Sequence, residues 1–149
     1  MNTNAINLWQ IQVEAWRPDL NMQKIRHQAE WTTNWWILVL SEMVVPGYFI
    51  WDDWKENEYV KHCKEFNDEI VKLSWNHNIT IVWWNVEIDE TRKNEDSTIR
   101  KYNASYLVSN WELVKTQYKT LLPNYGIFDD KRYFTSLKDF AEEEGVDIE

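Results

Sequence analysis

Few side chains in this sequence could act as a nucleophile. There is one cysteine, Cys63, and there are three histidines, His27, His62 and His77. His62 directly precedes Cys63, but adjacent residues on a helix point about 100° apart, and Cys63 falls in an apolar helical stripe. A buried thiol of this kind behaves as a small hydrophobic group. The pattern therefore predicts no catalytic cysteine.

Metal and phosphate chemistry find equally little support. The spacings HxxxH, CxxC and HExxH are absent, and Glu58, His62 and Glu65 on one helix face indicate surface ion pairs. Phosphate-binding loops need clustered glycines, because the backbone must approach the anion closely. The three glycines are isolated: Gly47, Gly126 and Gly145. We expect no metal and no cofactor.

Pairs of acidic residues leave hydrolysis by two carboxylates open. The pairs are Asp52 with Asp53, Asp89 with Glu90, and Asp129 with Asp130. Adjacent acids in loops and at helix starts are commonly solvated caps, and Asp53 is a candidate N-cap. The sequence therefore predicts no catalytic residue among them.

Composition and charge describe one acidic domain. The 149 residues include 25 Asp or Glu against 16 Lys or Arg, for a net charge of −9. This length supports a single domain, residues 1–149. A negative surface repels phosphate, so direct nucleic-acid binding is disfavoured and a basic protein partner is favoured. The N-terminus carries no export signal and no apolar run fits a membrane span, so a cytoplasmic location is expected.

Tryptophan is the most informative residue type, with 11 copies. Trp35-Trp36 and Trp83-Trp84 are adjacent pairs, and consecutive strand residues face opposite sides of a sheet. Trp51-Asp52-Asp53-Trp54 places two rings beside two acids at a predicted helix start. Such a surface suits an Arg- or Lys-rich partner, through charge steering and cation–π contact. A sugar-binding platform is the competing interpretation.

The first half of the sequence predicts two strands and two helices. Alternation of apolar and polar residues predicts a strand over Trp9–Ala15, and Pro18 starts a helix. Residues 35–45 resemble a buried strand, although a longer helix also fits them. Asp53, with Glu56 in capping-box spacing, starts a second helix that ends at 76–78. Its apolar stripe consists of Val60, Cys63, Phe66, Ile70 and Leu73.

The second half predicts a hairpin followed by two helices. Residues 79–88 are rich in β-branched side chains, 91–97 form a polar loop, and 98–108 form the returning strand. Ser109 and Glu112 have capping-box spacing before a helix reaching Leu121, and a last helix runs from Ser136 to Gly145. The predicted class is α+β, an antiparallel or mixed sheet with three to four packed helices.

The profile of size, acidity and Trp/Asp clusters resembles the immunity proteins of bacterial toxin–immunity pairs, including those of contact-dependent inhibition systems. The closing segment Tyr133-Phe-Thr-Ser-Leu-Lys-Asp-Phe-Ala-Glu-Glu is similar to the F-x-S-L-x-x-F final helix of several such families. The resemblance implies a small, cytoplasmic, non-enzymatic protein that binds one toxin domain, often a basic nuclease.

The predicted function is therefore an immunity protein that occludes the active site of a cognate basic toxin domain. An anti-defence protein of a phage or plasmid, with an acidic face that mimics nucleic acid, and a small enzyme with a carboxylate or tyrosine site are the alternatives. The predicted partner-binding residues are Trp51, Asp52, Asp53, Trp54, Glu56, Glu87, Asp89, Glu90, Asp129 and Asp130.

Overall fold

The computed structural model describes residues 6–32, 36–94 and 96–148. Within these ranges it contains three α-helices, two 3₁₀ segments and a five-stranded sheet. In chain order the elements are β1 (Ile6–Leu8), α1 (Pro18–Trp31), β2 (Ile37–Val39), η1 (Trp51–Lys55), α2 (Asn57–His77), β3 (Thr80–Lys93), β4 (Ile99–Ser109), β5 (Glu112–Tyr118), η2 (Asp130–Arg132) and α3 (Leu137–Glu144). The predicted α+β class with a mixed sheet is confirmed.

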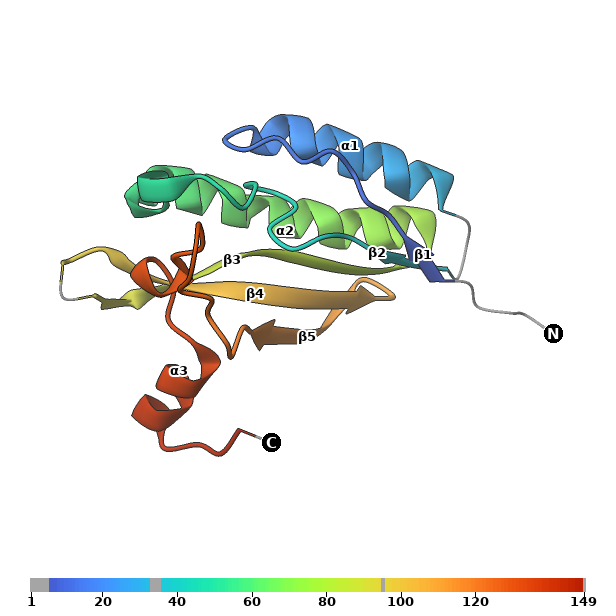
Figure 1. Ribbon diagram of the computed structural model, residues 1–149. Helices are drawn as coiled ribbons and strands as arrows, with labels where there is room; N and C mark the ends of the chain where they lie inside the picture. The colour runs from blue at the N-terminus through green and yellow to red at the C-terminus, as the bar shows by residue number, and fades with distance from the viewer. Residues whose placement is uncertain (1–5, 33–35, 95, 149) are drawn as a thin grey trace.

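The strands follow one another across the sheet in sequence order, β1-β2-β3-β4-β5. The first three are parallel, so α1 and α2 serve as the crossovers that parallel pairs require. The last three form an antiparallel meander joined by short connections. Figure 1 shows α1 and α2 lying together on one side of this sheet, with α3 apart from them.

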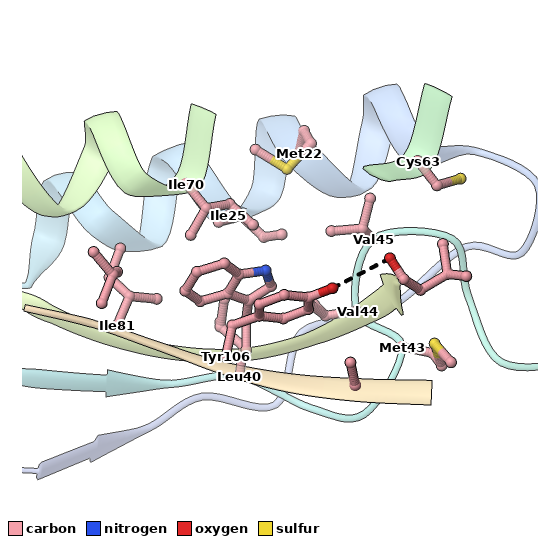
Figure 2. Close-up of a cluster of buried hydrophobic side chains, with 14 of the residues drawn as sticks. Met22, Ile25, Leu40, Met43, Val44, Val45, Cys63, Ile70, Ile81 and Tyr106 are labelled. Atoms are coloured by element: carbon pink, nitrogen blue, oxygen red, sulfur yellow. Dashed lines mark hydrogen bonds between the residues drawn. The ribbon is translucent and has the colours of Figure 1, made fainter. Parts of the chain in front are cut away.

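The core lies between these two helices and the sheet. Figure 2 shows Met22 and Ile25 of α1 and Ile70 of α2 above Ile81 and Tyr106 of the strands, all buried. The predicted apolar stripe of α2 is confirmed as core or as packed against it. The predicted end of α2 is also confirmed, because Asn78 takes the left-handed conformation (φ 53°) that stops a helix.

The opposite face of the sheet is less covered. Along β3, Ile81 and Trp83 are buried toward the helices, whereas Val82 and Trp84 are only half-buried. Leu107, the partner of Val82 in β4, is half-buried as well. We call the face that carries Val82, Trp84 and Leu107 the open face of the sheet.

The predicted strand at Trp9–Ala15 is wrong. Trp9 N still donates to Val39 O (3.1 Å), but the segment then leaves the sheet and runs beside α1. Buried Asn21 replaces the missing strand partner, because its side chain accepts from Glu14 N (2.8 Å) and donates to Glu14 O (2.7 Å). The alternation therefore reflects burial against a helix rather than pairing.

The strand predicted over 35–45 is shorter, and the helix alternative there is wrong. Trp35 lies outside the described residues, and β2 covers only Ile37–Val39. The chain then turns through Met43 (φ 50°) and Gly47 (φ 82°), conformations that neither a strand nor a helix contains. Four residues of this turn remain buried: Leu40, Met43, Val44 and Val45. Ser41 is half-buried, and Glu42 is exposed.

Two predicted helix starts are also wrong. The helix assigned from Asp53 begins at Asn57, after a 3₁₀ segment that buries Trp54, and Asp53 accepts from the indole of Trp16. The helix assigned from Ser109 is strand β5, which follows a two-residue turn at Asn110 (φ 50°) and Trp111 (φ 62°). Positive φ at both central residues is the geometry of a hairpin turn.

The last predicted helix is confirmed. Ser136 caps α3, its hydroxyl accepts from Asp139 N (3.1 Å), and Asp139 returns the bond to complete a capping box. Gly145 ends the helix in the left-handed conformation (φ 64°). None of the helices within the described ranges has the length and apolar character that crossing a bilayer requires.

Gly47 should be the least replaceable glycine. A Cβ there would lie 2.7 Å from Ala15 Cα, and φ 82° already disfavours alanine. We expect Gly47→Ala to lower the free energy of unfolding by about 2–4 kcal/mol in urea titrations. Gly126→Ala is the matched control, because its φ is 61° but nothing lies within 4 Å, so about 1 kcal/mol is expected. Equal losses in the two variants would contradict the close packing at Gly47.

Candidate functional site

Three segments far apart in sequence bring charged side chains together beside the sheet. Glu42 follows β2, Lys119 follows β5 directly, and Asp130 begins η2. Lys119 Nζ lies 2.7 Å from Glu42 Oε1 and 2.9 Å from Asp130 Oδ2. One ammonium group therefore bridges two carboxylates.

Asn103 of β4 links both sides of this cluster. Its side-chain amide donates to Glu42 Oε1 (2.6 Å), and its backbone carbonyl accepts from Lys119 N (2.8 Å). Asn103 as a whole is 1% exposed, and its side-chain Oδ1 is buried without a partner among the described residues. Asn103 thus fixes the position of Glu42 and Lys119 together from the rigid sheet.

Asp130 anchors the cluster in the interior. Its side chain is 4% exposed and also accepts from the Tyr48 hydroxyl at 2.6 Å. A buried carboxylate is costly unless it is paired and hydrogen-bonded, and Asp130 has both kinds of partner. Burial, followed by the neighbouring Asp130, raises the pKa of Tyr48 above its ordinary value, so Tyr48 remains a donor.

The ammonium of Lys119 stays charged at this site. Burial opposes its charge, but the hydrogen bonds to Glu42 and Asp130 outweigh burial and raise the pKa of Lys119. Its Nζ also lies 5.6 Å from the centre of the Tyr48 ring. Glu42, by contrast, is 38% exposed at its side chain, so the cluster opens to the outside at the carboxylate.

The cluster lies on the face of the sheet that α2 does not cover. Asn103 pairs with Val86 in the register of β3 and β4, and Asn85, the residue before Val86, donates to Cys63 O in α2 (2.7 Å). Because successive strand residues point to opposite faces, Asn103 and Glu42 lie across the sheet from Cys63. The cluster is therefore on the same side as the open face.

Cys63 is not part of this site. Its side chain is buried in the core, and burial raises the pKa of the thiol to about 12. Among the described residues, no three His, Cys, Asp or Glu side chains are placed to hold a metal ion. The chemistry available at the cluster is that of a partly exposed carboxylate and a fixed ammonium group. Such a pair can accept a proton and stabilise a developing negative charge.

Several predicted partner-binding residues gather next to this cluster. Trp51, Trp54, Asp129 and Asp130 line one small cavity, and Trp51 is 51% exposed. Trp54 is 2% exposed and Asp130 3%, so each is a buried residue. Asp52, the residue after Trp51, is paired with Arg132 at 2.8 Å.

The other predicted residues lie elsewhere. Glu87 and Glu90 of β3 pair with Lys64 (2.5 Å) and Lys61 (2.9 Å) of α2, on the helix side of the sheet. Asp89 accepts from Thr91 N where the register of β3 shifts, and Glu56 is the N-cap residue of α2. Contact of any of these residues with a partner stays a prediction.

Sequence reasoning missed Glu42, Lys119, Tyr48 and Asn103 as site residues. Their contacts span up to 82 positions, which no local pattern records. One signal was present: Glu42 is an acid inside an otherwise apolar run, and such an acid needs a partner. Lys119 gives no signal, because the spacing of Ser109 and Glu112 predicts a helix for the segment before it, which is strand β5.

Comparison with known proteins identifies relatives that are enzymes. No family model matches the chain. A glutamine-dependent NAD(+) synthetase of Thermotoga maritima is 28% identical over 98 residues, which are 66% of this chain and 16% of the synthetase. The chain therefore spans about a sixth of the length of this curated relative.

Solved structures of two kinds share the fold. The glutamine-dependent NAD+ synthetases of Acinetobacter baumannii and Cytophaga hutchinsonii match 88% of this chain with TM-scores of 0.65 and 0.72, at 24% and 20% identity. The matches cover 23% and 21% of those chains. A nitrilase-superfamily amidase of Nesterenkonia, in a cysteine-to-alanine mutant, matches 88% of this chain and 47% of its own at 16% identity and a TM-score of 0.68.

These findings correct the function predicted from sequence. The resemblance to toxin-immunity proteins is wrong, and so are the predicted non-enzymatic role and the predicted toxin partner. The relative is an NAD synthetase, and the structural neighbours are NAD synthetases and an amidase. The small-enzyme alternative agrees better with them. Size, acidity and Trp content are shared by many unrelated proteins, so the profile could not separate the two classes.

The stability of the protein should depend on the ion pair between Lys119 and Asp130. We expect Lys119→Met to lower the free energy of unfolding by about 3 kcal/mol in urea titrations, because it leaves a buried carboxylate without its charged partner. Lys138→Met is the matched control, since Lys138 pairs with Glu142 at 3.9 Å on an exposed helix face and should leave stability unchanged. A harmless Lys119→Met would show that Asp130 is not a buried charge.

Cys63 should be inert in the folded protein. A pKa of about 12 against an ordinary value of 9.0 makes the thiolate about a thousandfold scarcer at pH 8. We expect modification by a thiol-specific disulfide reagent to be at least that much slower in buffer than in concentrated urea. Equal rates in the two conditions would contradict the burial of Cys63.

Proposed function

We propose that this chain carries the proton-accepting and oxyanion-binding part of a site that hydrolyses carboxamides, in the manner of the nitrilase superfamily. The observation that carries the proposal is the Lys119 ammonium held between Glu42 and Asp130 at 2.7 and 2.9 Å, beside a partly exposed carboxylate. The kinship of the chain supports the same chemistry: its relative is glutamine-dependent, glutamine carries a carboxamide, and one structural neighbour is an amidase.

The roles of the two groups follow from their contacts. Both hydrogen bonds to Glu42 fall on Oε1, so Oε2 is left to take the proton of an attacking thiol. Lys119 is charged and fixed, so it can donate to the carbonyl oxygen as negative charge develops there. The sulfur–carbon bond forms, the carbon–nitrogen bond breaks, and the proton passes from Glu42 to the departing ammonia. Water then releases the acid and regenerates the thiol.

The nucleophile of this proposed reaction comes from outside these 149 residues. Cys63 is the single cysteine of the sequence, and it lies across the sheet from Glu42. In one Nesterenkonia amidase variant, the acetamide moiety of fluoroacetamide is covalently attached at an active-site cysteine. The open face, with half-buried Val82 and Trp84, offers the surface across which such a thiol would reach Glu42.

Only the amide-cleaving step enters the proposed function. Synthesis of NAD+ is left out, because the chain spans no more than 23% of the synthetases that it matches. A carboxamide substrate takes the place of the toxin partner that the sequence profile suggested. The cytoplasmic location expected from the sequence stays a prediction.

Binding of small amides to the 149-residue chain tests the proposal without requiring the nucleophile. Titration with acetamide and with glutamine, followed by ¹H–¹⁵N NMR, should perturb the Glu42 and Lys119 region with dissociation constants of about 1 mM or weaker. Glu42→Gln should weaken binding of both amides several-fold, because the free carboxylate oxygen Oε2, which can accept from the N–H of an amide, becomes an NH₂ group that can only donate. Because the Glu42 side chain is partly exposed, we expect this variant to fold normally.

The matched control is an ion pair of similar length on the other face of the sheet. Lys61 and Glu90 lie 2.9 Å apart and take no part in the cluster, so Glu90→Gln should leave amide binding unchanged. The proposed function fails if neither amide binds, or if Glu42→Gln and Glu90→Gln have the same effect.

A further inference from the structure

Aromatic side chains border the Glu42–Lys119–Asp130 cluster on one side. They come from two segments, 48–51 and 125–128, and are the four that we call the aromatic rim: Phe49, Trp51, Tyr125 and Phe128. Phe49 is 39% exposed, Trp51 51% and Tyr125 71%. Rings of this size are usually more buried, so their exposure next to a charged cluster needs an explanation.

The rim is continuous with the ammonium group. Phe49 lies 5.9 Å from Trp51 and 5.8 Å from Phe128, measured between ring centres. Phe128 in turn lies 5.8 Å from Tyr48, the ring that faces Lys119 Nζ. A molecule bound at Lys119 through its carbonyl oxygen would therefore have an unbroken aromatic surface beside it.

The rim forms a platform rather than a pocket. The cavity beneath it measures about 20 Å³, with Phe49 and Trp51 in its lining, and holds no more than a water molecule. A ligand ring would therefore lie against the exposed indole and phenyl surfaces, in offset or edge contact.

The aromatic rim itself is uncharged. The acidic residues next to it in sequence, Asp52 and Asp129, are both paired with Arg132, at 2.8 and 4.0 Å. No rim residue is charged, and both neighbouring carboxylates already share Arg132, so the rim offers a ligand aromatic contact instead of an ion pair.

The backbone of Trp51 adopts a strained conformation, which the surrounding structure must hold in place. Its φ is 50°, a left-handed conformation that is unfavourable for a bulky side chain. The same conformation makes glycine an ideal replacement there, because Gly removes the ring and relieves the strain together.

We infer that the aromatic rim is the acyl-binding platform of the proposed amide site and that it selects neutral aryl carboxamides, such as benzamide, over small alkyl amides. This inference rests on the proposed function, because it places the carboxamide at Glu42 and Lys119. Phe49 and Trp51 are its specificity-determining residues.

The test compares benzamide with acetamide on the 149-residue chain by NMR titration. Benzamide should bind about tenfold more tightly, the gain expected from one or two aromatic contacts. Trp51→Gly and Phe49→Ala should each reduce this ratio several-fold, by weakening benzamide binding more than acetamide binding. Trp111→Gly is the matched control, since Trp111 is 63% exposed at φ 62° and lies in the β4–β5 turn, away from the rim.

The outcomes separate this inference from the proposed function. Equal binding of the two amides, sensitive to Glu42→Gln, would overturn the aryl preference and leave the amide site standing. Binding of benzamide that Glu42→Gln does not weaken, or equal losses in Trp51→Gly and Trp111→Gly, would also overturn the inference. Absence of binding by either amide would overturn both. A benzamide advantage that Trp51→Gly removes and Trp111→Gly retains would support the platform.

Discussion

The buried carboxylate of Asp130 is the constraint on which the rest of this site depends. A charge with 4% of its side chain exposed must find a cation and donors, and Lys119 and Tyr48 supply them. Once Lys119 is committed to Asp130, its remaining hydrogens are directed toward Glu42, and Asn103 holds Glu42 in turn. The partly exposed pair is thus positioned by the buried one, so the interior of the protein determines the geometry at its surface.

Local patterns in the sequence predict those parts of the fold that local interactions stabilise. The stripe of α2, the stop at Asn78 and the capping box of α3 each depend on residues a few positions apart. The hairpin β3–β4 was also predictable, because its strands are adjacent and rich in β-branched side chains. These elements account for the α+β class.

The remainder of the fold depends on contacts that no local pattern contains. Residues 9–15 alternate like a strand, yet Asn21 takes the place of a neighbouring strand. Ser109 and Glu112 have the spacing of a helix cap, yet Asn110 and Trp111 adopt a turn that starts β5. The site is the extreme case, since Glu42 and Lys119 lie 77 positions apart. Sequence reasoning selected acidic pairs because they are adjacent, whereas the cluster unites single residues from separate segments.

The order of the strands has a kinetic meaning. The antiparallel meander β3–β4–β5 pairs strands that follow one another directly in the chain, so its contacts are shorter in sequence than those of the parallel pairs and close at a lower entropic cost. The bridge between Lys119 and Glu42 and the bond between Tyr48 and Asp130 close loops of 77 and 82 residues. Such loops are entropically costly until the sheet has already brought their ends together. We therefore expect the cluster of Glu42, Lys119 and Asp130 to be among the last features to assemble.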